Sequence, residues 1–258
     1  MTLLAAGKGF EPPSSRDFVF SPLFGKGTVF TKPMLIIIVG SIAIALFFWL
    51  AARQSKVVPG KLQYAGEAVY GFVRNSIAGD AIGQGSRKFV PYLVTLFSFI
   101  FVMNISGVLP LVGFSATSKF AVPLFLAIIS CVIFNYVGIR RVGLGTYFKD
   151  MMFPPGVPWP VYILLAPIEF LSTVLIRPVT LTLRLQLNMF AGHLVLVLCI
   201  LGGAYMANAS GALPALSWIG FVAGVILTFF EAFVQFLQAY VFVLLSALYI
   251  GGALADQH

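Results

Sequence analysis

The stretch Pro178-Val-Thr-Leu-Thr-Leu-Arg184-Leu-Gln-Leu-Asn188-Met-Phe-Ala-Gly192-His193 decides the fold, because it carries polar residues through a long apolar segment. That segment runs from about 161 to 204, and a second one runs from about 215 to 255. Helices of such length extend for roughly 60 Å, about twice the hydrocarbon thickness of a bilayer. Neither segment contains a polar loop that would divide it into two short spans. We therefore predict two long helices that lie steeply tilted in the membrane.

Turn-forming residues separate these two segments. The sequence Asn208-Ala-Ser-Gly211-Ala-Leu-Pro214 combines Asn, Ser, Gly and Pro, which together mark a turn. The two long helices are therefore expected to fold back on each other as an antiparallel hairpin.

The composition is that of an integral membrane protein. Hydrophobic residues make up 60% of the 258 positions, charged residues only 9%, and the mean hydropathy is +1.00. Soluble domains carry about 25% charged residues. The net charge of +8 comes mainly from basic residues in short loops, which is typical of orientation signals and not of nucleic-acid binding. We predict an all-α, polytopic protein whose single membrane domain, 33–255, has about five membrane-embedded helices and one amphipathic surface helix.

Three shorter apolar stretches precede the hairpin, at about 33–52, 89–112 and 120–139, and each is long enough to cross a bilayer. An apolar stripe at helical spacing lies between the first two, formed by Leu62, Ala65, Val69, Phe72, Val73 and Ile77. This stripe predicts an amphipathic helix over about 60–78 that lies on the membrane surface. Pro167 and Pro178 are expected to kink the first long helix.

Lys and Arg are distributed unevenly among the loops. Six lie in 53–88 and three in 140–150, against one in 113–119 and none in 205–217. The positive-inside rule then places the first two loops in the cytoplasm. It predicts an extracytoplasmic N-terminal segment, 1–32, and a cytoplasmic C-terminus.

No cofactor or metal is expected. Cys131 and Cys199 each lie inside an apolar stretch, and no Cys/His cluster has metal-ligand spacing. The glycine-containing stretch 138–145 lacks the Gly-Lys-Ser/Thr ending that a phosphate-binding loop needs.

Ionisable and amide side chains inside the hairpin are the candidate functional residues. They are Glu169, Arg177, Arg184, Asn188 and His193 in the first segment and Glu231, Gln235 and Gln238 in the second. A guanidinium at membrane depth costs at least about 2.5–3.5 kcal/mol, and arginine cannot avoid that cost by losing its proton. Arg184 therefore indicates an ion pathway.

Residues that face each other in an antiparallel hairpin have numbers that add to a constant. The totals are 422 for Arg184 and Gln238, 423 for Asn188 and Gln235, and 424 for His193 and Glu231. One register, centred on Gly211 or Ala212, thus joins all three pairs. The His193–Glu231 pair lies about 13 Å along the axis from Arg184 and points away from the Arg184 face.

The residue types indicate the chemistry. Histidine and glutamate in a hydrated cleft can accept and release protons. Arg184 is suited to be a fixed barrier to protons and an attractor for a passing carboxylate, while Asn and Gln can hold water. Polar pairs can also serve only to lock helix packing, and for Asn188 or Gln235 alone this alternative stays open. Arg177 equally fits a snorkelling residue at the interface, and Glu169 is open in the same way.

These residues resemble subunit a of the rotary F-type ATP synthases. The likeness rests on Arg184-Leu185, Asn188-Met189, Ala191-Gly192-His193, Glu231 and Gln238-Ala239, together with Asn104 and Leu109-Pro110 in an earlier span. It covers roughly residues 30–255. Some members have Glu after Ala-Gly and His on the last helix, and this chain is similar to the exchanged arrangement. Gln186-Leu187 departs from the usual Phe-Gly pair after Arg-Leu.

The resemblance implies a proton-translocating stator subunit beside a ring of c subunits, with two offset aqueous half-channels that Arg184 separates. It implies pathway roles for Glu169, Asn188, His193, Glu231, Gln235 and Gln238, and leaves Arg177 and Asn104 open between pathway and structure. Further implied partners are b-type peripheral-stalk subunits and the F1 head, with the ATP chemistry in partner subunits and not in this chain. No transit peptide is recognised, so a bacterial plasma membrane is expected.

A self-contained, ion-coupled secondary transporter is the alternative function. Such transporters usually show internal repeats and broken helices at the membrane midplane, and the sequence shows neither. A non-conducting membrane anchor is a weaker alternative, because it gives no reason for the charged residues.

Overall fold

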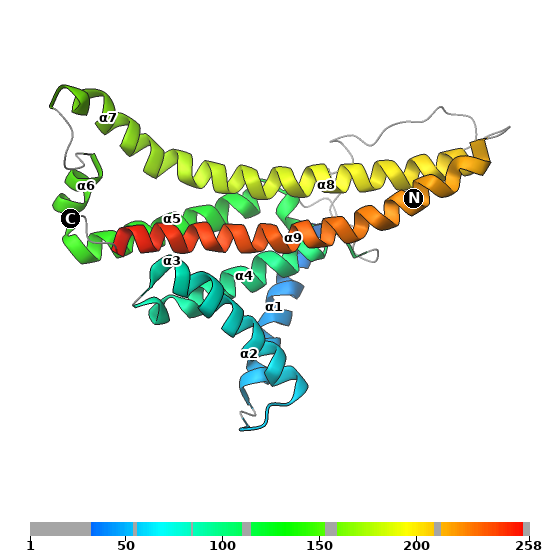
Figure 1. Ribbon diagram of the computed structural model, residues 1–258, viewed down its shortest axis with the longest axis horizontal. Helices are drawn as coiled ribbons and strands as arrows, with labels where there is room; N and C mark the ends of the chain where they lie inside the picture. Colours follow the sequence, from blue (N-terminus) through cyan, green and yellow to red (C-terminus); the bar gives the residue numbers. More distant parts are fainter. Residues whose placement is uncertain are drawn as a thin grey trace, which may run out of the picture.

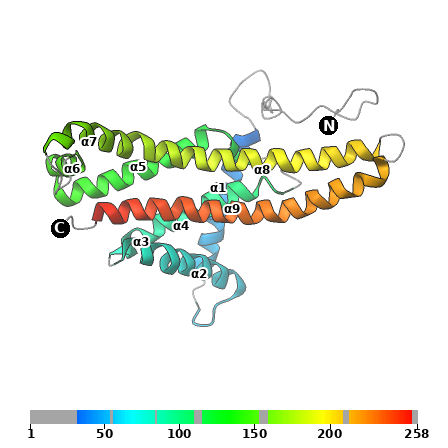
Figure 2. The ribbon, with the colours of Figure 1, turned by 45° about the horizontal axis from the view of Figure 1, so that its top comes forward.

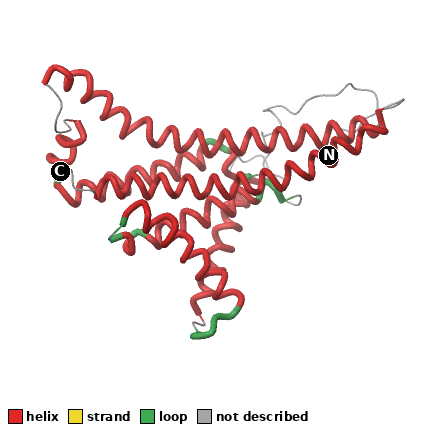
Figure 3. Tube along the Cα trace, in the orientation of Figure 1, coloured by secondary structure: helices red, strands yellow, loops and turns green. Residues whose placement is uncertain are grey.

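The computed structural model describes residues 32–53, 56–83, 85–109, 115–152, 159–208 and 213–254. All regular structure in these ranges is helical (Figure 3), which confirms the predicted all-α class. The α-helices are α1 Lys32–Arg53, α2 Lys61–Val73, α3 Asp80–Ile82, α4 Val90–Ile105, α5 Ala121–Val142, α6 Leu144–Met152, α7 Trp159–Leu171, α8 Arg177–Ala207 and α9 Ser217–Leu254. The predicted extracytoplasmic segment 1–32 lies outside the described residues, apart from Lys32, where α1 begins.

The two longest helical segments run antiparallel to each other as a hairpin (Figure 1). Helix α7 continues into α8 through a π-helical turn, so that the first arm is helical from Trp159 to Ala207. The part of this arm that is apolar enough to span a membrane, Leu164–Ala207, has 44 residues, and α9 has 38 residues. These lengths correspond to about 66 Å and 57 Å, well beyond the hydrocarbon thickness of a bilayer. Helix α1, which is long and apolar enough to span a membrane, crosses the direction of the hairpin (Figure 1). A bilayer spanned by α1 would therefore hold the hairpin in a steeply tilted position.

The first arm of the hairpin contains a wide turn where two prolines interrupt its backbone hydrogen bonding. Pro167 lies inside α7, Pro178 is the second residue of α8, and the π-helical turn Ser172–Ile176 lies between them. Proline has no N–H to donate, so the carbonyl four residues before it needs another partner. A π-helical turn is one way for the helix to continue past such an irregularity.

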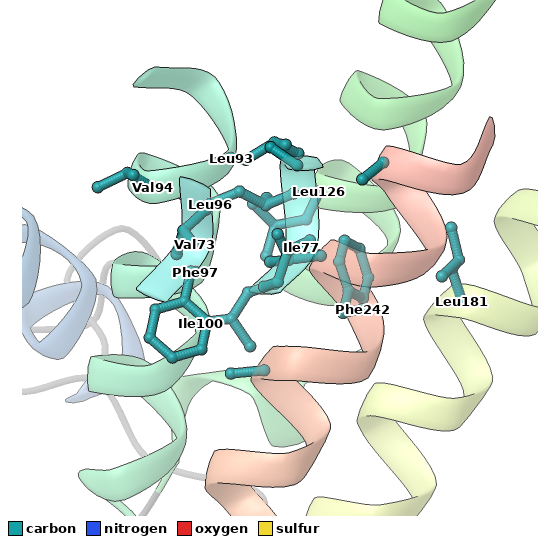
Figure 4. Close-up of a cluster of buried hydrophobic side chains, with 14 of the residues drawn as sticks. Val73, Ile77, Leu93, Val94, Leu96, Phe97, Ile100, Leu126, Leu181 and Phe242 are labelled. Carbon is teal, nitrogen blue, oxygen red and sulfur yellow. The ribbon is translucent and has the colours of Figure 1, made fainter. Parts of the chain in front are cut away.

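A cluster of buried apolar side chains joins the hairpin to α4 and α5 (Figure 4). Helix α9 packs on α4 and α5, and α8 packs on α5. The cluster includes Leu93, Phe97 and Ile100 from α4, Leu126 from α5, Leu181 and Leu185 from α8, and Phe242 from α9. Because Leu181 and Leu185 face this core, the residues on the other side of α8 point away from the protein interior.

The apolar stripe of the predicted surface helix packs partly against other helices of the protein. Helical structure continues beyond the predicted range 60–78, through a π-helical turn at Arg74–Gly79 and into α3. Val73 and Ile77 are fully buried in the core cluster, and the α3 segment packs against the C-terminal part of α9. An apolar stripe with a period of 3.6 residues shows that one face of a helix is apolar, but it does not show whether lipid or protein covers that face.

Helix α4 is shorter than the span predicted at 89–112. It has 16 residues and ends at Ile105, which gives a length of about 24 Å. The chain then turns at Ser106, whose hydroxyl donates a hydrogen bond to the carbonyl oxygen of Met103 at 2.7 Å. Val108 and Leu109 belong to the predicted span but follow the end of the helix, and the rest of that span, 110–112, lies outside the described residues. Helix α5 begins within a residue of its predicted position and extends three residues further, through Val142.

Candidate functional site

Two close contacts between glycines and the opposite helix define the register of the hairpin. A Cβ atom on Gly220 would lie 2.7 Å from the Cα of Gly203, and one on Gly192 would lie 3.1 Å from Oε1 of Glu231. The numbers in each of these pairs add to 423, the middle of the three totals derived from the sequence. The predicted register is therefore that of the structure, and glycine permits the helices to approach this closely.

Glu231 is buried in the interface between α8 and α9, with only 6% of its surface exposed. Its Oε1 atom accepts a hydrogen bond from Nε2 of Gln235 at 3.2 Å, one turn further along α9. Its Oε2 atom has no hydrogen-bond partner within the described part of the chain. A buried carboxyl group with one oxygen unpaired is suited to bind water or to carry a proton.

A cavity of about 230 Å³ opens beside this carboxyl group. Asn188 and Gly192 of α8 line it together with Glu231 and Gln235 of α9. Three of the nine residues that line it are polar and the others are apolar or glycine, and a water molecule needs two to four polar partners in such a space. The structure thus brings Asn188, Gln235 and Glu231 together around a space that can be hydrated.

His193 is half-buried on α8 and does not line this cavity. It directly follows Gly192, the residue against which the Glu231 side chain packs. His193 is thus one residue further along α8 than the contact between Gly192 and Glu231. A direct contact between the His193 imidazole and the Glu231 carboxyl group stays a prediction.

Arg184 is exposed on α8, as is the preceding Leu183, whereas the following residue, Leu185, is buried. No hydrogen bond or ion pair joins its guanidinium to another residue that the structure describes. Gln238, its predicted partner on α9, is buried, and the Nε2 atom of that amide also has no partner among the described residues. A permanent charge turned outward from an apolar hairpin requires water or an anionic group from another molecule.

Arg177 is held by aromatic rings. Its guanidinium lies 5.0 Å from the ring centroid of Tyr249 on α9 and 6.0 Å from that of Phe134 on α5. Both distances are within the range of cation–π attraction. Burial raises the pKa of the nearby Tyr147 hydroxyl, and the charge of Arg177 lowers it. These contacts join α8 to α5 and α9 through the Arg177 side chain.

Glu169 is half-buried on α7, before the π-helical turn. Helix α7 packs on α6, and both lie at the end of the molecule away from the hairpin turn (Figure 2). Glu169 is therefore far along the first arm from Glu231 and its cavity.

Asn104 is fully buried at the end of α4 and belongs to a hydrogen-bonded network that the sequence reasoning missed. Its Oδ1 atom accepts a hydrogen bond from the Thr117 hydroxyl at 2.7 Å, and that hydroxyl is bonded to Ser115 at 2.7 Å. Ser115 in turn donates to the carbonyl oxygen of Met103 at 2.8 Å. The hydroxyl residues of 115–118, directly before the third span, were the available signal. Asn104 therefore fixes the end of α4 against the segment that precedes α5.

A second polar chain was also missed and links three helices. The Tyr92 hydroxyl of α4 is bonded to the Ser130 hydroxyl of α5 at 2.8 Å, and Ser246 of α9 donates to Ser130 at 3.3 Å. Single hydroxyls in apolar helices have no distinctive spacing, so the sequence carries no signal for this contact.

The fold and the site define a class of protein: an all-α, polytopic membrane protein with a long hairpin that buries a carboxyl group and exposes an arginine. Comparison with known proteins is more specific. The family model described as ATP synthase A chain matches residues 34–251. The chain is 46% identical to ATP synthase subunit a of a Nocardioides species, covering 98% of this chain and 96% of that protein.

Other curated relatives agree. The chain is 43% identical to ATP synthase subunit a of Streptomyces lividans, over 98% of this chain and 90% of that one. It is 41% identical to ATP synthase subunit a of Rhodococcus erythropolis, over 100% of this chain and 95% of that one. The chain belongs to the ATP synthase subunit a family, and the resemblance found in the sequence is confirmed.

Proposed function

We propose that this chain is the proton-translocating stator subunit a of a rotary F-type ATP synthase, in which Arg184 separates two aqueous half-channels. Membership of the family makes it a multi-pass bacterial membrane protein and a subunit of the ATP synthase complex that takes part in proton transport. The proposed partners are a ring of c subunits, b-type stalk subunits and the F1 head, and the proposed location is the plasma membrane.

The outward position of Arg184 is the observation that carries this proposal. The residue is exposed on α8, and nothing in the described part of the chain neutralises it. A carboxylate on a neighbouring rotor would supply the missing anion without a fixed bond. Because the guanidinium keeps its charge, it attracts a deprotonated rotor carboxylate and opposes the passage of a free proton.

Glu231 and its cavity fit one of the two half-channels. Gly192, which contacts the carboxyl group, is eight residues from Arg184, or about 12 Å along the helix axis. Glu231 faces the inside of the hairpin and Arg184 faces outward. We infer that a proton on Glu231 does not pass Arg184 within this chain alone and that a moving carrier takes it across.

We assign directions to the half-channels from the loop charges. The positive-inside rule places the hairpin turn outside the cell, with the N-terminus outside and the C-terminus in the cytoplasm. Glu231 and His193 then belong to the periplasm-side half-channel, and Glu169 lies toward the cytoplasmic one. Cysteines placed at 193 and 231, with Cys131 and Cys199 replaced by Ala, should react with impermeant thiol reagents added outside. Reaction solely from the cytoplasmic face would reverse the assignment.

Reconstitution tests the proposal against a self-contained transporter. The purified chain in liposomes should not conduct protons when a potential is imposed with potassium and valinomycin. The same chain reconstituted with the c ring and stalk subunits should conduct them, and Arg184→Ala should change that conductance. Ion-coupled solute transport by the chain alone would refute the stator function.

A further inference from the structure

A second and larger cavity lies away from the hairpin, between α1, α2 and α4. It has a volume of about 760 Å³, within the range of pockets that hold a drug-sized molecule. None of the residues assigned to the proton pathway lines it. The function of this cavity is therefore separate from that of the hairpin.

Two close helix crossings frame the cavity. Gly40 of α1 packs against the Met103 side chain of α4, and a Cβ on Gly66 of α2 would lie 3.0 Å from the Cβ of Ala51 on α1. Between these points, α1 lines the cavity from Ser41 to Ala52. That distance is about 16 Å along the helix, or roughly half the hydrocarbon thickness of a bilayer. The cavity thus has the length of one leaflet.

The walls of the cavity are apolar along most of this length. Ile44, Phe48, Val94 and Phe99 are among the lining residues. The hydroxyl of Thr95 donates a hydrogen bond to the carbonyl oxygen of Pro91 in its own helix, so it offers little to a ligand. A hydrocarbon chain fits such walls, because every methylene group removed from water contributes about 0.8 kcal/mol.

The charged and amide side chains that line the cavity lie at one end, whereas the hydroxyls of Ser41 and Thr95 are bonded within their own helices and Tyr70 adds a phenol to the α2 wall. Glu67 and Gln63 line that end, next to Ala52 and close to the C-terminal end of α1. The Gln63 amide donates to Oε1 of Glu67 at 2.8 Å, which orients the carboxylate. Glu67 is the one formally charged residue among those that line the cavity. The complementary headgroup is therefore cationic.

We propose that this cavity binds one phospholipid with an amine headgroup, its acyl chain between α1 and α4 and its ammonium group at Glu67. The lipid belongs to the leaflet that contains the C-terminal end of α1. It fills the space that the two helix crossings leave open and so supports the packing of α1 and α2 on α4. This inference depends on α1 as a membrane span and not on the proton pathway.

Photolabelling of the assembled synthase tests the site. Vesicles of phosphatidylethanolamine and phosphatidylglycerol carry a trace of either lipid with a diazirine on its acyl chain, and labelled residues are mapped by mass spectrometry. The ethanolamine probe should label the α1 and α4 walls, including Val94. Ala45→Trp, which fills the cavity, should reduce this labelling at least tenfold, whereas Val132→Trp on the exposed face of α5 should not.

The headgroup is tested separately with Glu67→Gln, which keeps the size of the side chain. This variant should label as strongly as the wild type but lose the preference for the ethanolamine probe over the glycerol probe. An unchanged preference, or equal labelling in Ala45→Trp, would overturn the proposal. Labelling of the isolated chain but not of the assembled synthase would also overturn it, because a partner helix would then fill the cavity.

Discussion

Gly192→Val tests whether the placement of the Glu231 carboxyl group controls proton translocation. A Cβ atom at position 192 would lie 3.1 Å from Oε1 and 3.2 Å from Cδ of Glu231, closer than ordinary van der Waals contact. Valine adds two further methyl groups and also reduces the cavity that Gly192 lines. The carboxyl group therefore has to move.

The expected loss follows from the cost of overpacking, about 1–3 kcal/mol. If this whole cost acts on the working position of the carboxyl group, the rate falls about five- to 150-fold, since 1.36 kcal/mol corresponds to a factor of ten. The assay is ATP synthesis in membrane vesicles driven by a proton gradient, normalised to the amount of assembled synthase.

Gly71→Val is the matched control. It places the same β-branched residue in α2, where a Cβ would have no atom within 4 Å, and it should change synthesis by less than about twofold. Equal rates in the two variants would refute the reasoning. If Gly192→Val does not assemble, Gly192→Ala makes the same contact with a smaller side chain and should show a smaller loss in the same direction.

Two further predictions concern Arg184 and the buried network at Asn104. Arg184→Ala should abolish coupled ATP synthesis and leave a passive proton leak, because the fixed positive barrier is lost; wild-type synthesis in vesicles would contradict the assignment. Thr117→Val should destabilise the purified protein by about 1–3 kcal/mol, because Oδ1 of the buried Asn104 loses its donor. Thermal unfolding in detergent measures this effect, with Thr180→Val as control, since the Thr180 hydroxyl bonds only within its own helix and is exposed. Equal loss in both variants would argue against a structural network at Asn104.

The sequence predicted the hairpin because length and register are one-dimensional properties. Each arm is an uninterrupted apolar segment, and a turn with Asn, Gly and Pro separates the two. The residue numbers of facing polar pairs add to a nearly constant total, which predicted the register. The contacts Gly203–Gly220 and Gly192–Glu231 have this register. The predicted second span continues beyond Ile105, where the helix ends, because apolar composition does not show where backbone hydrogen bonding stops.

The candidate site was predicted in part. Asn188, Gln235 and Glu231 were grouped from the sequence and do share one cavity. The sequence does not predict the hydrogen bond from Thr117 to Asn104 or the cation–π contacts of Arg177, although it leaves a structural role open for Arg177. Those contacts join segments that no periodic pattern connects.

By itself, the sequence determined the membrane class, the long antiparallel hairpin and the polar residues inside it. These follow from composition, periodicity and spacing, which act locally along the chain. Only the tertiary structure decided that Arg184 faces outward while Glu231 is buried, that the stripe of α2 contacts protein, and that α1, α2 and α4 enclose a cavity between them. The physical reason is that the rotation of each helix, and what covers each face, depend on packing between distant segments.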